Sequence, residues 1–205
     1  VCIAALLSLT AVSAFRPLTL PLTPRLRTLQ MVDASALTVI DPSYNLAAGS
    51  ATLGLLCGLL EDQKSEGDGV LKSVATKLAG VGALLFTLFG LFMAYQTTTL
   101  RFTFFSADAA FSLVKADLTS SGNNVVVGGG NIWKYSSFQN WGFLPSKELP
   151  VLVYFREDQT PQEAWQDAPQ ILAVDSLKGQ VHYFPAIARS DQLAEAFTAS
   201  GCKKQ

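Results

Sequence analysis

Two apolar stretches dominate the first half of the chain and alternate with polar sequence. Leu46 to Leu60 is fifteen residues without a charge, and Leu78 to Tyr95 is eighteen. A membrane-spanning helix needs about 20 apolar residues, with about 17 as a lower limit. The second stretch meets this limit, and the first reaches it when Tyr44 and Asn45 are included, with Tyr44 as an interfacial anchor. We therefore predict a transmembrane helical hairpin over residues 46–96, the alternative for the first stretch being a buried core helix.

The segment between the two stretches is polar, and the stretches themselves carry small residues. Glu61 to Lys77 holds four acids and three lysines, so we predict a loop in water. Gly54 and Gly58 form a GxxxG pattern, in which small residues let two helix backbones approach closely in lipid. Gly82 and Gly90 supply small residues on the second helix. The four glycines are therefore predicted to pack the two helices together.

After the second stretch, the pattern changes from the helical period to an alternation with period two. Short runs of this kind, rich in β-branched and aromatic residues, predict strands. Turn-forming sequences rich in glycine, asparagine and serine separate the runs, which indicates an antiparallel sheet. The predicted strands are Leu100–Phe104, Phe111–Lys115, Val151–Phe155, Ile171–Val174 and Val181–Phe184.

The chain ends in a predicted helix. Ser190 suits an N-cap, Leu193 and Phe197 share one face, and Gly201 provides a stop. Strands closed by a C-terminal helix are the layout of a pleckstrin-homology-like (PH-like) barrel, although an open α+β sheet would produce the same pattern. The predicted fold class is a membrane α+β protein. It has a two-helix transmembrane hairpin, then a small antiparallel PH-like sheet or barrel with a C-terminal helix over residues 97–201.

The composition agrees with a membrane protein. Only 15% of the 205 residues are charged, against about 25% in soluble proteins, and 49% are hydrophobic. The net charge of −1 gives no sign of a basic surface, so no nucleic acid is expected as a partner. The three cysteines, Cys2, Cys57 and Cys202, include no CxxC pair and accompany a single histidine. Neither a disulfide framework nor a metal site is therefore expected.

The first 30 residues have the composition of a targeting leader. Ile3 to Ala14 is an apolar run that ends in small residues, as a signal peptide does. Phe15 follows, and the sequence from there to Gln30 carries three arginines and no acid. This order resembles the bipartite plastid leader of red-lineage algae, the alternative being a secretory signal with a linker. We expect residues 1–30 to be removed and residues 31–45 to form an N-terminal tail.

Two residues are candidate pigment ligands. His182 is the only histidine and lies within the apolar run Val181–Phe184. Its imidazole is suited to ligate the magnesium of a chlorophyll, although a lone strand histidine more often packs in a core or lies on a surface. Gln96, just past the second apolar stretch, is a weaker candidate of the same kind.

Four aromatic residues lie close together in the chain. Trp133, Tyr135, Phe138 and Trp141 fall within nine residues. Aromatic side chains are enriched at protein interfaces and at the lipid headgroup level. They are equally suited to the core of a small sheet domain. Both interpretations stay open, and we expect at least one of the two tryptophans to be buried.

No pattern in the chain predicts catalysis. A nucleophile motif such as GxSxG is absent from the sequence. The adjacent acids Glu157 and Asp158 lie beside Thr160-Pro161 in polar sequence, so we predict a solvated loop there. The protein is therefore not expected to be an enzyme, and no cofactor of its own is expected.

Several ordered motifs carry a family resemblance. They are Val39–Tyr44, Leu88–Phe92, Gln96-Thr97, Leu100–Phe102, Gln139–Trp141, Pro150–Glu157 and His182–Pro185. With these motifs the chain resembles an uncharacterised family of cyanobacteria and plastids, whose members have a two-helix membrane hairpin and a small sheet domain.

The resemblance implies a place in photosynthesis. It points to a non-catalytic accessory or structural subunit of photosystem I in the plastid thylakoid membrane, with the sheet domain on the stromal side. The implied partners are photosystem I core and antenna proteins and thylakoid lipid, with chlorophyll, carotenoid or lipid at the contacts. The alternative is a membrane-tethered PH-like binding module or a photosystem assembly factor.

Overall fold

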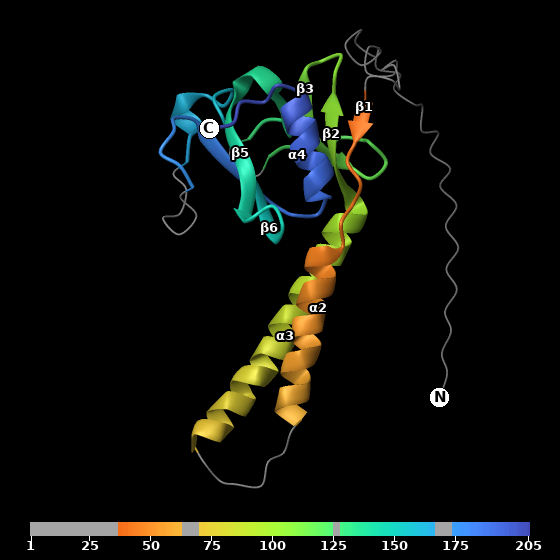
Figure 1. Cartoon of the computed structure of the whole chain (residues 1–205), viewed down its shortest axis with the longest axis vertical. Coiled ribbons are helices and arrows are strands. Elements are labelled where there is room, and N and C mark those ends of the chain that lie inside the picture. The colour runs from red at the N-terminus through yellow and green to blue at the C-terminus, as the bar shows by residue number, and fades with distance from the viewer. Residues whose placement is uncertain (1–36, 63–69, 125–127, 167–173) are drawn as a thin grey trace, which may run out of the picture. The chain divides into compact units, whose positions relative to one another are not determined.

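The structure is a computed structural model that describes residues 37–62, 70–124, 128–166 and 174–205. The predicted leader and the first part of the predicted tail lie outside these residues, as does most of the strand expected at Ile171–Val174. Helices and strands follow one another as Figure 1 shows. They are β1 (Leu37–Val39), α2 (Asn45–Asp62), α3 (Val70–Thr99), β2 (Leu100–Phe105), β3 (Ala110–Lys115), β4 (Ile132–Lys134), β5 (Phe138–Pro145), β6 (Pro150–Glu157), β7 (Gln180–Pro185) and α4 (Ser190–Ala199).

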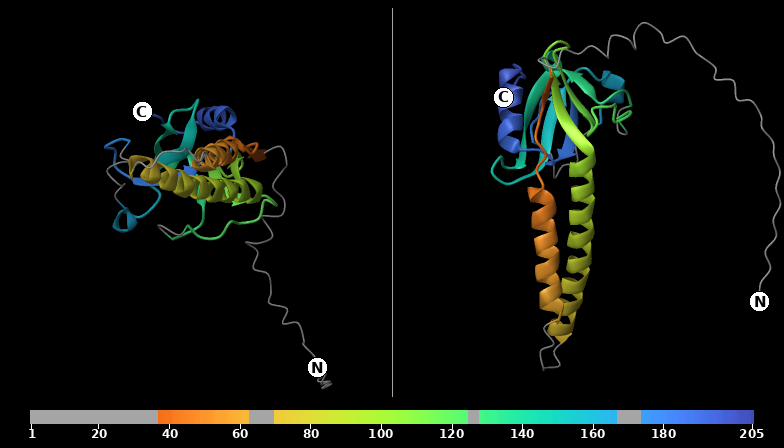
Figure 2. Two further views of the ribbon diagram at one scale, coloured as in Figure 1. Left: turned by 90° about the horizontal axis from the view of Figure 1, so that it is seen from below. Right: turned by 90° about the vertical axis from the view of Figure 1, so that its right-hand side faces the viewer.

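Helices α2 and α3 lie side by side and antiparallel, as Figure 2 shows. Helix α3 begins at Val70, so the polar loop predicted to extend to Lys77 is wrong over its last eight residues. Among the described residues one helix, Ser73–Thr99, is long and apolar enough to cross a membrane, with a hydropathy of 2.0. The apolar part of α2, Asn45–Leu60, is shorter than a full span. The described residues therefore contain a helical hairpin of which one helix qualifies as a span by length and composition.

The helical hairpin is inserted between two neighbouring strands. Strand β1 pairs with β2 in antiparallel register, with Val39 opposite Thr103. The Ile40 amide donates to the Phe102 carbonyl at 3.0 Å, which continues this ladder by one step. Further along, the hydroxyls of Tyr44 and Thr98 lie 3.2 Å apart. Strand β2 thus follows α3 without a gap, and the short segment Ile40–Tyr44 leads from β1 into α2.

The strands form two antiparallel sheets. The first has the order β1-β2-β3-β4 and the second the order β5-β6-β7. Within the described residues the two sheets share no strand pairing, so the closed barrel among the predicted alternatives is not formed. The predicted antiparallel sheets and C-terminal helix are confirmed. Strands β2, β3, β6 and β7 coincide with predicted strands, whereas β1, β4 and β5 were not predicted.

An aromatic core holds the two sheets and α4 together. Phe102 and Phe111 of the first sheet are buried, as are Phe155 of the second sheet and Phe197 of α4. The Phe111 ring lies 5.5 Å from Phe155 and 5.0 Å from Phe197, measured between centroids. Aromatic pairs at such distances add to the stability that burial of their area provides. One continuous core therefore fixes both sheets relative to α4.

Helix α4 presents the face that its sequence predicts. Leu193 and Phe197, four residues apart, are both fully buried, as the helical period requires. Gly201 adopts a φ of 68° and ends the helix, a conformation that glycine takes without strain. The N-cap prediction is wrong, because Arg189 occupies that position and Ser190 is helical. The Ser190 hydroxyl instead donates to the Lys147 carbonyl at 3.0 Å.

Candidate functional site

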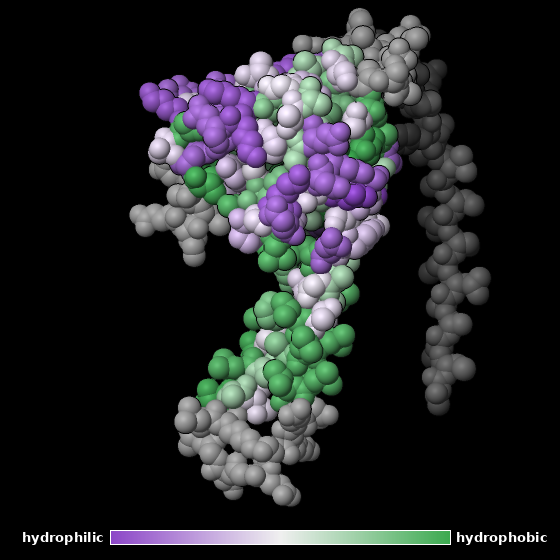
Figure 3. Space-filling view, in the orientation of Figure 1, coloured by the Kyte–Doolittle hydropathy of each residue, from purple (hydrophilic) through white to green (hydrophobic). Residues whose placement is uncertain are grey.

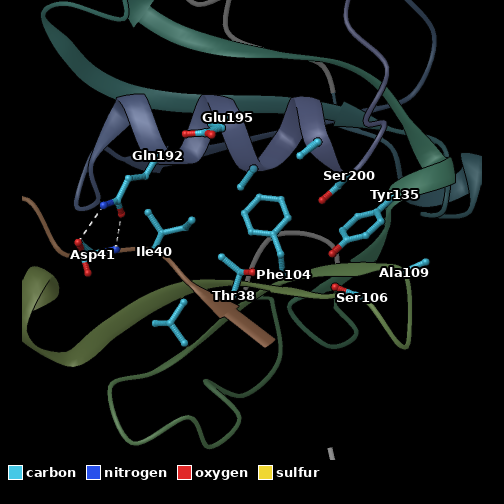
Figure 4. Close-up of a pocket in the computed structure, with 13 residues that line it drawn as sticks. Thr38, Ile40, Asp41, Phe104, Ser106, Ala109, Tyr135, Gln192, Glu195 and Ser200 are labelled. Carbon is cyan, nitrogen blue, oxygen red and sulfur yellow. Dashed lines mark hydrogen bonds between the residues drawn. The ribbon is translucent and has the colours of Figure 1, made fainter. Parts of the chain in front are cut away.

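A hollow in the α+β part of the molecule lies between β1 and α4. Its volume is about 740 Å³, within the range of small-molecule sites. Phe104 of β2 and Ile40 contribute apolar surface, and Gln192 and Glu195 of α4 contribute polar surface (Figure 4). We call it the β1–α4 groove. Its lining is Thr38, Val39, Ile40, Asp41, Phe104, Ser106, Ala109, Tyr135, Gln192, Glu195, Ala196, Ala199 and Ser200.

A reciprocal pair of hydrogen bonds closes one end of the β1–α4 groove. The Asp41 amide donates to Gln192 Oε1 at 3.0 Å, and Gln192 Nε2 donates to Asp41 Oδ2 at 2.8 Å (Figure 4). The pair ties the chain before α2 to the first turn of α4. Because both groups of the glutamine are occupied, this end of the groove is a structural clamp.

The other end of the β1–α4 groove carries hydroxyl groups. Burial raises the pKa of the Tyr135 phenol, and a hydrogen bond with Ser200 partly offsets that rise. The phenol therefore stays protonated over the physiological range and can donate or accept a hydrogen bond. The two carboxylates of the lining, Asp41 and Glu195, face no lysine or arginine within it. The groove is thus suited to a neutral or cationic group beside an apolar surface.

A buried acid lies at the end of β6. Glu157 has no exposed surface, and its carboxylate accepts hydrogen bonds from Thr160 Oγ1 at 2.6 Å and from the Thr160 amide at 2.9 Å. His182 Nε2 lies 2.9 Å from the same carboxylate. Burial alone raises the pKa of Glu157, but the bonds from His182 and Thr160 outweigh it and hold the pKa below its usual value. The solvated loop predicted for Glu157 is therefore wrong, whereas Asp158 is exposed.

The two candidate pigment ligands lie in different parts of the fold. His182 is 4% exposed, in β7, with its ring stacked on Phe155 and 5.0 Å from the Trp133 ring. Its Nε2 is engaged by Glu157, so ligation of a magnesium through this atom would first break a buried pair. Gln96 is half-buried in the last turns of α3. The structure does not bring these two residues together.

The four aromatic candidates belong to the interior of the α+β part. Trp133, Phe138 and Trp141 are each at most 3% exposed, so core packing, one of the two open interpretations, describes these three. Trp141 stacks on Phe197 with centroids 5.0 Å apart, and its Nε1 donates to the Cys202 carbonyl. Tyr135 is half-buried and lines the β1–α4 groove. Only Tyr135 therefore remains available to a ligand or partner.

The glycines of the hairpin differ in how closely the opposite helix approaches. A methyl group at Gly90 would lie 3.0 Å from the Ala47 carbonyl oxygen, and one at Gly54 would lie 2.5 Å from Thr87 Oγ1. At Gly82 the nearest atom, Cys57 Sγ, would be 3.3 Å away. At Gly58 the nearest atom would be 3.9 Å away, an ordinary contact. The closest approach of the two backbones is thus at the half of the hairpin nearer the sheets.

Metal-binding side chains do not gather anywhere in the described residues. Within the part of the chain that the structure describes, no group of three or more histidine, cysteine or carboxylate side chains is placed to hold a metal ion. Sequence patterns missed Glu157, whose only local signal is the threonine three residues later. They also missed the β1–α4 groove, which depends on a strand and a helix about 150 residues apart.

Comparison with protein families gives a match over most of the chain. A family model described as "Protein of unknown function (DUF3119)" matches residues 38–201, from β1 to the end of α4. The match covers most of the chain and includes the hairpin as well as both sheets. No curated protein and no solved structure matches the chain.

Proposed function

Since the chain belongs to the DUF3119 family of proteins of unknown function, we propose that it is a membrane-anchored, non-catalytic accessory protein. In this proposal α2 and α3 cross the bilayer as a hairpin. The two sheets and α4 form a PH-like domain on one membrane surface. The family match extends over both parts, which supports one functional unit rather than an anchor joined to an unrelated domain.

The observation that carries the proposal is the surface of the hairpin. Figure 3 shows hydrophobic residues over the visible face of the helices, beneath a largely hydrophilic α+β part. Of the apolar window of α3, only 11% is buried. A core helix of a soluble protein would be mostly covered, and an exposed apolar surface of this size in water favours aggregation. Leu55, Leu84 and Leu91 are among the outward-facing side chains.

The length of α2 is compatible with a span. Its 18 residues, of which Asn45–Leu60 form the apolar part, correspond to roughly 27 Å at 1.5 Å per residue, close to the ~30 Å thickness of the hydrocarbon core. Tyr44 and Tyr95 are exposed near the ends of the helices that adjoin the sheets. Tyrosine is enriched at that depth of a membrane. Both features favour a bilayer whose surface lies at the junction between helices and sheets.

The strand order supports a PH-like classification of the domain. Four strands, then three strands, then a C-terminal helix follow one another. A run of strands followed by a C-terminal helix is the layout that the sequence pattern associates with PH-like domains. The hairpin is inserted after the first strand, so the anchor interrupts the domain instead of preceding it.

The sequence resemblance supplies the location and the partner. We propose the plastid thylakoid membrane, with the PH-like domain on the stromal side. The proposed partners are photosystem I core and antenna proteins, with thylakoid lipid, chlorophyll or carotenoid at the contacts.

The β1–α4 groove favours a second candidate function, a membrane-tethered binding module. The groove has the volume of a ligand site and combines Phe104 with Tyr135 and Glu195. Such a module would exist as a pool free of photosystems and would carry a ligand in stoichiometric amount. An assembly factor that holds one photosystem component transiently belongs to the same candidate.

Fractionation of thylakoid membranes tests both candidates. Extraction at alkaline pH should leave the protein in the membrane pellet, and release into the supernatant would contradict the anchor. Mild detergent extracts should then be separated by size, and the protein followed by mass spectrometry against markers of photosystems I and II. Comigration with mature photosystem I at constant ratio supports the accessory subunit. Comigration only with small precursors, or with neither photosystem, supports the second candidate.

A further inference from the structure

A turn after β3 lies against the end of α3. The Ala116 amide donates to the carbonyl of Thr99, the last residue of α3, at 2.8 Å. Two bonds close the turn, from the Leu118 amide to the Lys115 carbonyl and from the Lys115 amide to the Thr119 carbonyl, each 2.9 Å long. Leu118 stands at the tip and is 46% exposed. This turn is therefore fixed beside the point where α3 meets the sheets.

A second turn, between β5 and β6, lies near the start of α2. The Lys147 carbonyl in this turn accepts the Ser190 hydroxyl at 3.0 Å. Next to that serine, the Arg189 amide donates to the Asp41 carbonyl at 3.0 Å, four residues before α2 begins. Leu149 stands at the tip of this turn and is 69% exposed. In Figure 1 the turn lies at the end of the sheets from which α2 and α3 leave.

The residue types at the two tips are unusual for turns in water. Leu118 has a φ of 64°, a conformation that glycine, asparagine and aspartate adopt readily and that bulky residues avoid. This backbone conformation is strained for a leucine, and the apolar side chain is left exposed. The side chain of Leu149 is also exposed and is not part of the core. Burial of the two side chains in an apolar phase would offset the backbone strain at Leu118 and remove both leucines from water.

The charges at the tips indicate which kind of surface they meet. Lys115 and Asp117 precede the first leucine within its turn, and Lys147 and Glu148 directly precede the second. All four charged side chains are exposed. Because each tip carries one positive and one negative charge, neither is a basic patch that would select anionic lipid. The pattern of a leucine beside paired opposite charges suits the boundary between headgroups and acyl chains.

We propose that Leu118 and Leu149 insert into the lipid interface on either side of the hairpin. The partner of these two tips is the bilayer surface itself, bound through apolar insertion and without preference for anionic headgroups. This inference rests on the proposed membrane hairpin and adds two contacts to it. Together with α2 and α3 they fix the tilt of the PH-like domain on the membrane.

Site-directed fluorescence in vesicles tests the insertion. The full chain, with its native cysteines replaced by alanine, is labelled with an environment-sensitive dye at Leu118→Cys or Leu149→Cys and reconstituted into phosphatidylcholine vesicles. Ala107→Cys is the matched control, because it lies in the exposed turn at the opposite end of the β2–β3 ladder. Leu84→Cys, exposed on α3, reports the hairpin itself. Lipids that carry a nitroxide near the headgroup act as the quencher.

The expected result is quenching at Leu118 and Leu149 several-fold above that at Ala107. It should be unchanged when anionic phosphatidylglycerol is added or the salt concentration is raised. Quenching at Leu84 alone would overturn the insertion and leave the membrane hairpin intact. Quenching at none of the four positions would overturn both. Tips that are quenched only with anionic lipid would overturn the apolar mode of binding. Tips shielded in native membranes but not in pure lipid would identify a protein partner instead.

Discussion

Replacing Gly90 with alanine tests the close contact between α2 and α3. The added methyl group would lie 3.0 Å from both the Ala47 carbonyl oxygen and the Ala51 amide nitrogen. Favourable separations of non-bonded heavy atoms are about 3.5 to 4.0 Å. The opposing atoms are backbone, so no side chain can rotate away and the helices must separate by about half an ångström. Gly90→Ala should therefore loosen the hairpin at the end that adjoins the sheets.

The expected magnitude follows from a matched control in the same hairpin. Gly49, in α2, has no atom of another element within 4 Å of the position where a methyl group would be added. Alanine gains about 1 kcal/mol over glycine in a helix at either position. Overpacking at Gly90 costs about 1 to 3 kcal/mol in addition. Gly90→Ala should thus be less stable than Gly49→Ala by about 1 to 3 kcal/mol, roughly 5- to 150-fold in the unfolding equilibrium.

The assay is equilibrium unfolding of the full chain in mixed detergent micelles, followed by the helical signal in circular dichroism. Gly58→Ala serves as a second control, because its methyl group would be 3.9 Å from the nearest atom. Gly54→Leu, with more bulk at a close contact, should exceed Gly90→Ala in its effect and lower accumulation in the membrane. Equal stability of Gly90→Ala and Gly49→Ala would refute the proposed role of close backbone approach.

Three further predictions concern the α+β part. Trp141→Ala should cost about 3 to 5 kcal/mol, seen as a lower denaturation midpoint by near-ultraviolet circular dichroism, because it removes the stack on Phe197; an unchanged midpoint would refute its place in the core. The pKa of Glu157 lies below its unfolded value of 4.5, so the stability that this residue contributes is present above that pH and is lost as the pH falls through the folded pKa. In Glu157→Gln the loss of stability in acid should be smaller. A variant whose stability falls with pH as steeply as that of the parent protein would contradict this prediction. Burial raises the pKa of Cys202 to about 12, so the folded protein should resist alkylation at this thiol at pH 8, with mass spectrometry after unfolding as the control; rapid modification would show that it is not enclosed.

The elements predicted from sequence are those with a strong local period. Strands β2, β3, β6 and β7 carry dense apolar or aromatic runs, and α2 and α3 carry long uncharged ones. Strand β5 was missed because Asn140 and Gly142 interrupt its apolar alternation. In the structure the Asn140 amide donates to the Tyr154 hydroxyl, and Gly142 leaves room for the ring of the same tyrosine. These requirements come from the neighbouring strand, so the local sequence does not reveal them.

The candidate site depends even more on distant partners. Strand β1 has three residues and pairs with β2 across some 60 residues of hairpin, so its sequence alone indicates only a tail. The burial of Glu157 depends on His182, which the strand β7 brings beside it. The sequence alone suggests His182 as a pigment ligand and predicts that Glu157, its neighbour in space, is solvated. The polar sequence predicts exposure, correctly for Asp158 and incorrectly for Glu157.

The insertion of the hairpin between β1 and β2 has a mechanical consequence. Helix α3 ends at Thr99 and β2 begins at Leu100, with no connecting loop. At this junction Arg101 Nη1 donates to the Thr97 carbonyl at 2.7 Å, a backbone acceptor that the helix end leaves open, and to the Leu100 carbonyl of β2 at 2.6 Å. A domain attached by one flexible linker could rotate freely over a membrane. Here two chain segments, already paired as strands, enter the helices together, so the orientation of the sheets follows that of the hairpin. The accessory role proposed above would benefit from this arrangement, because a fixed orientation reduces the entropy lost when a partner binds.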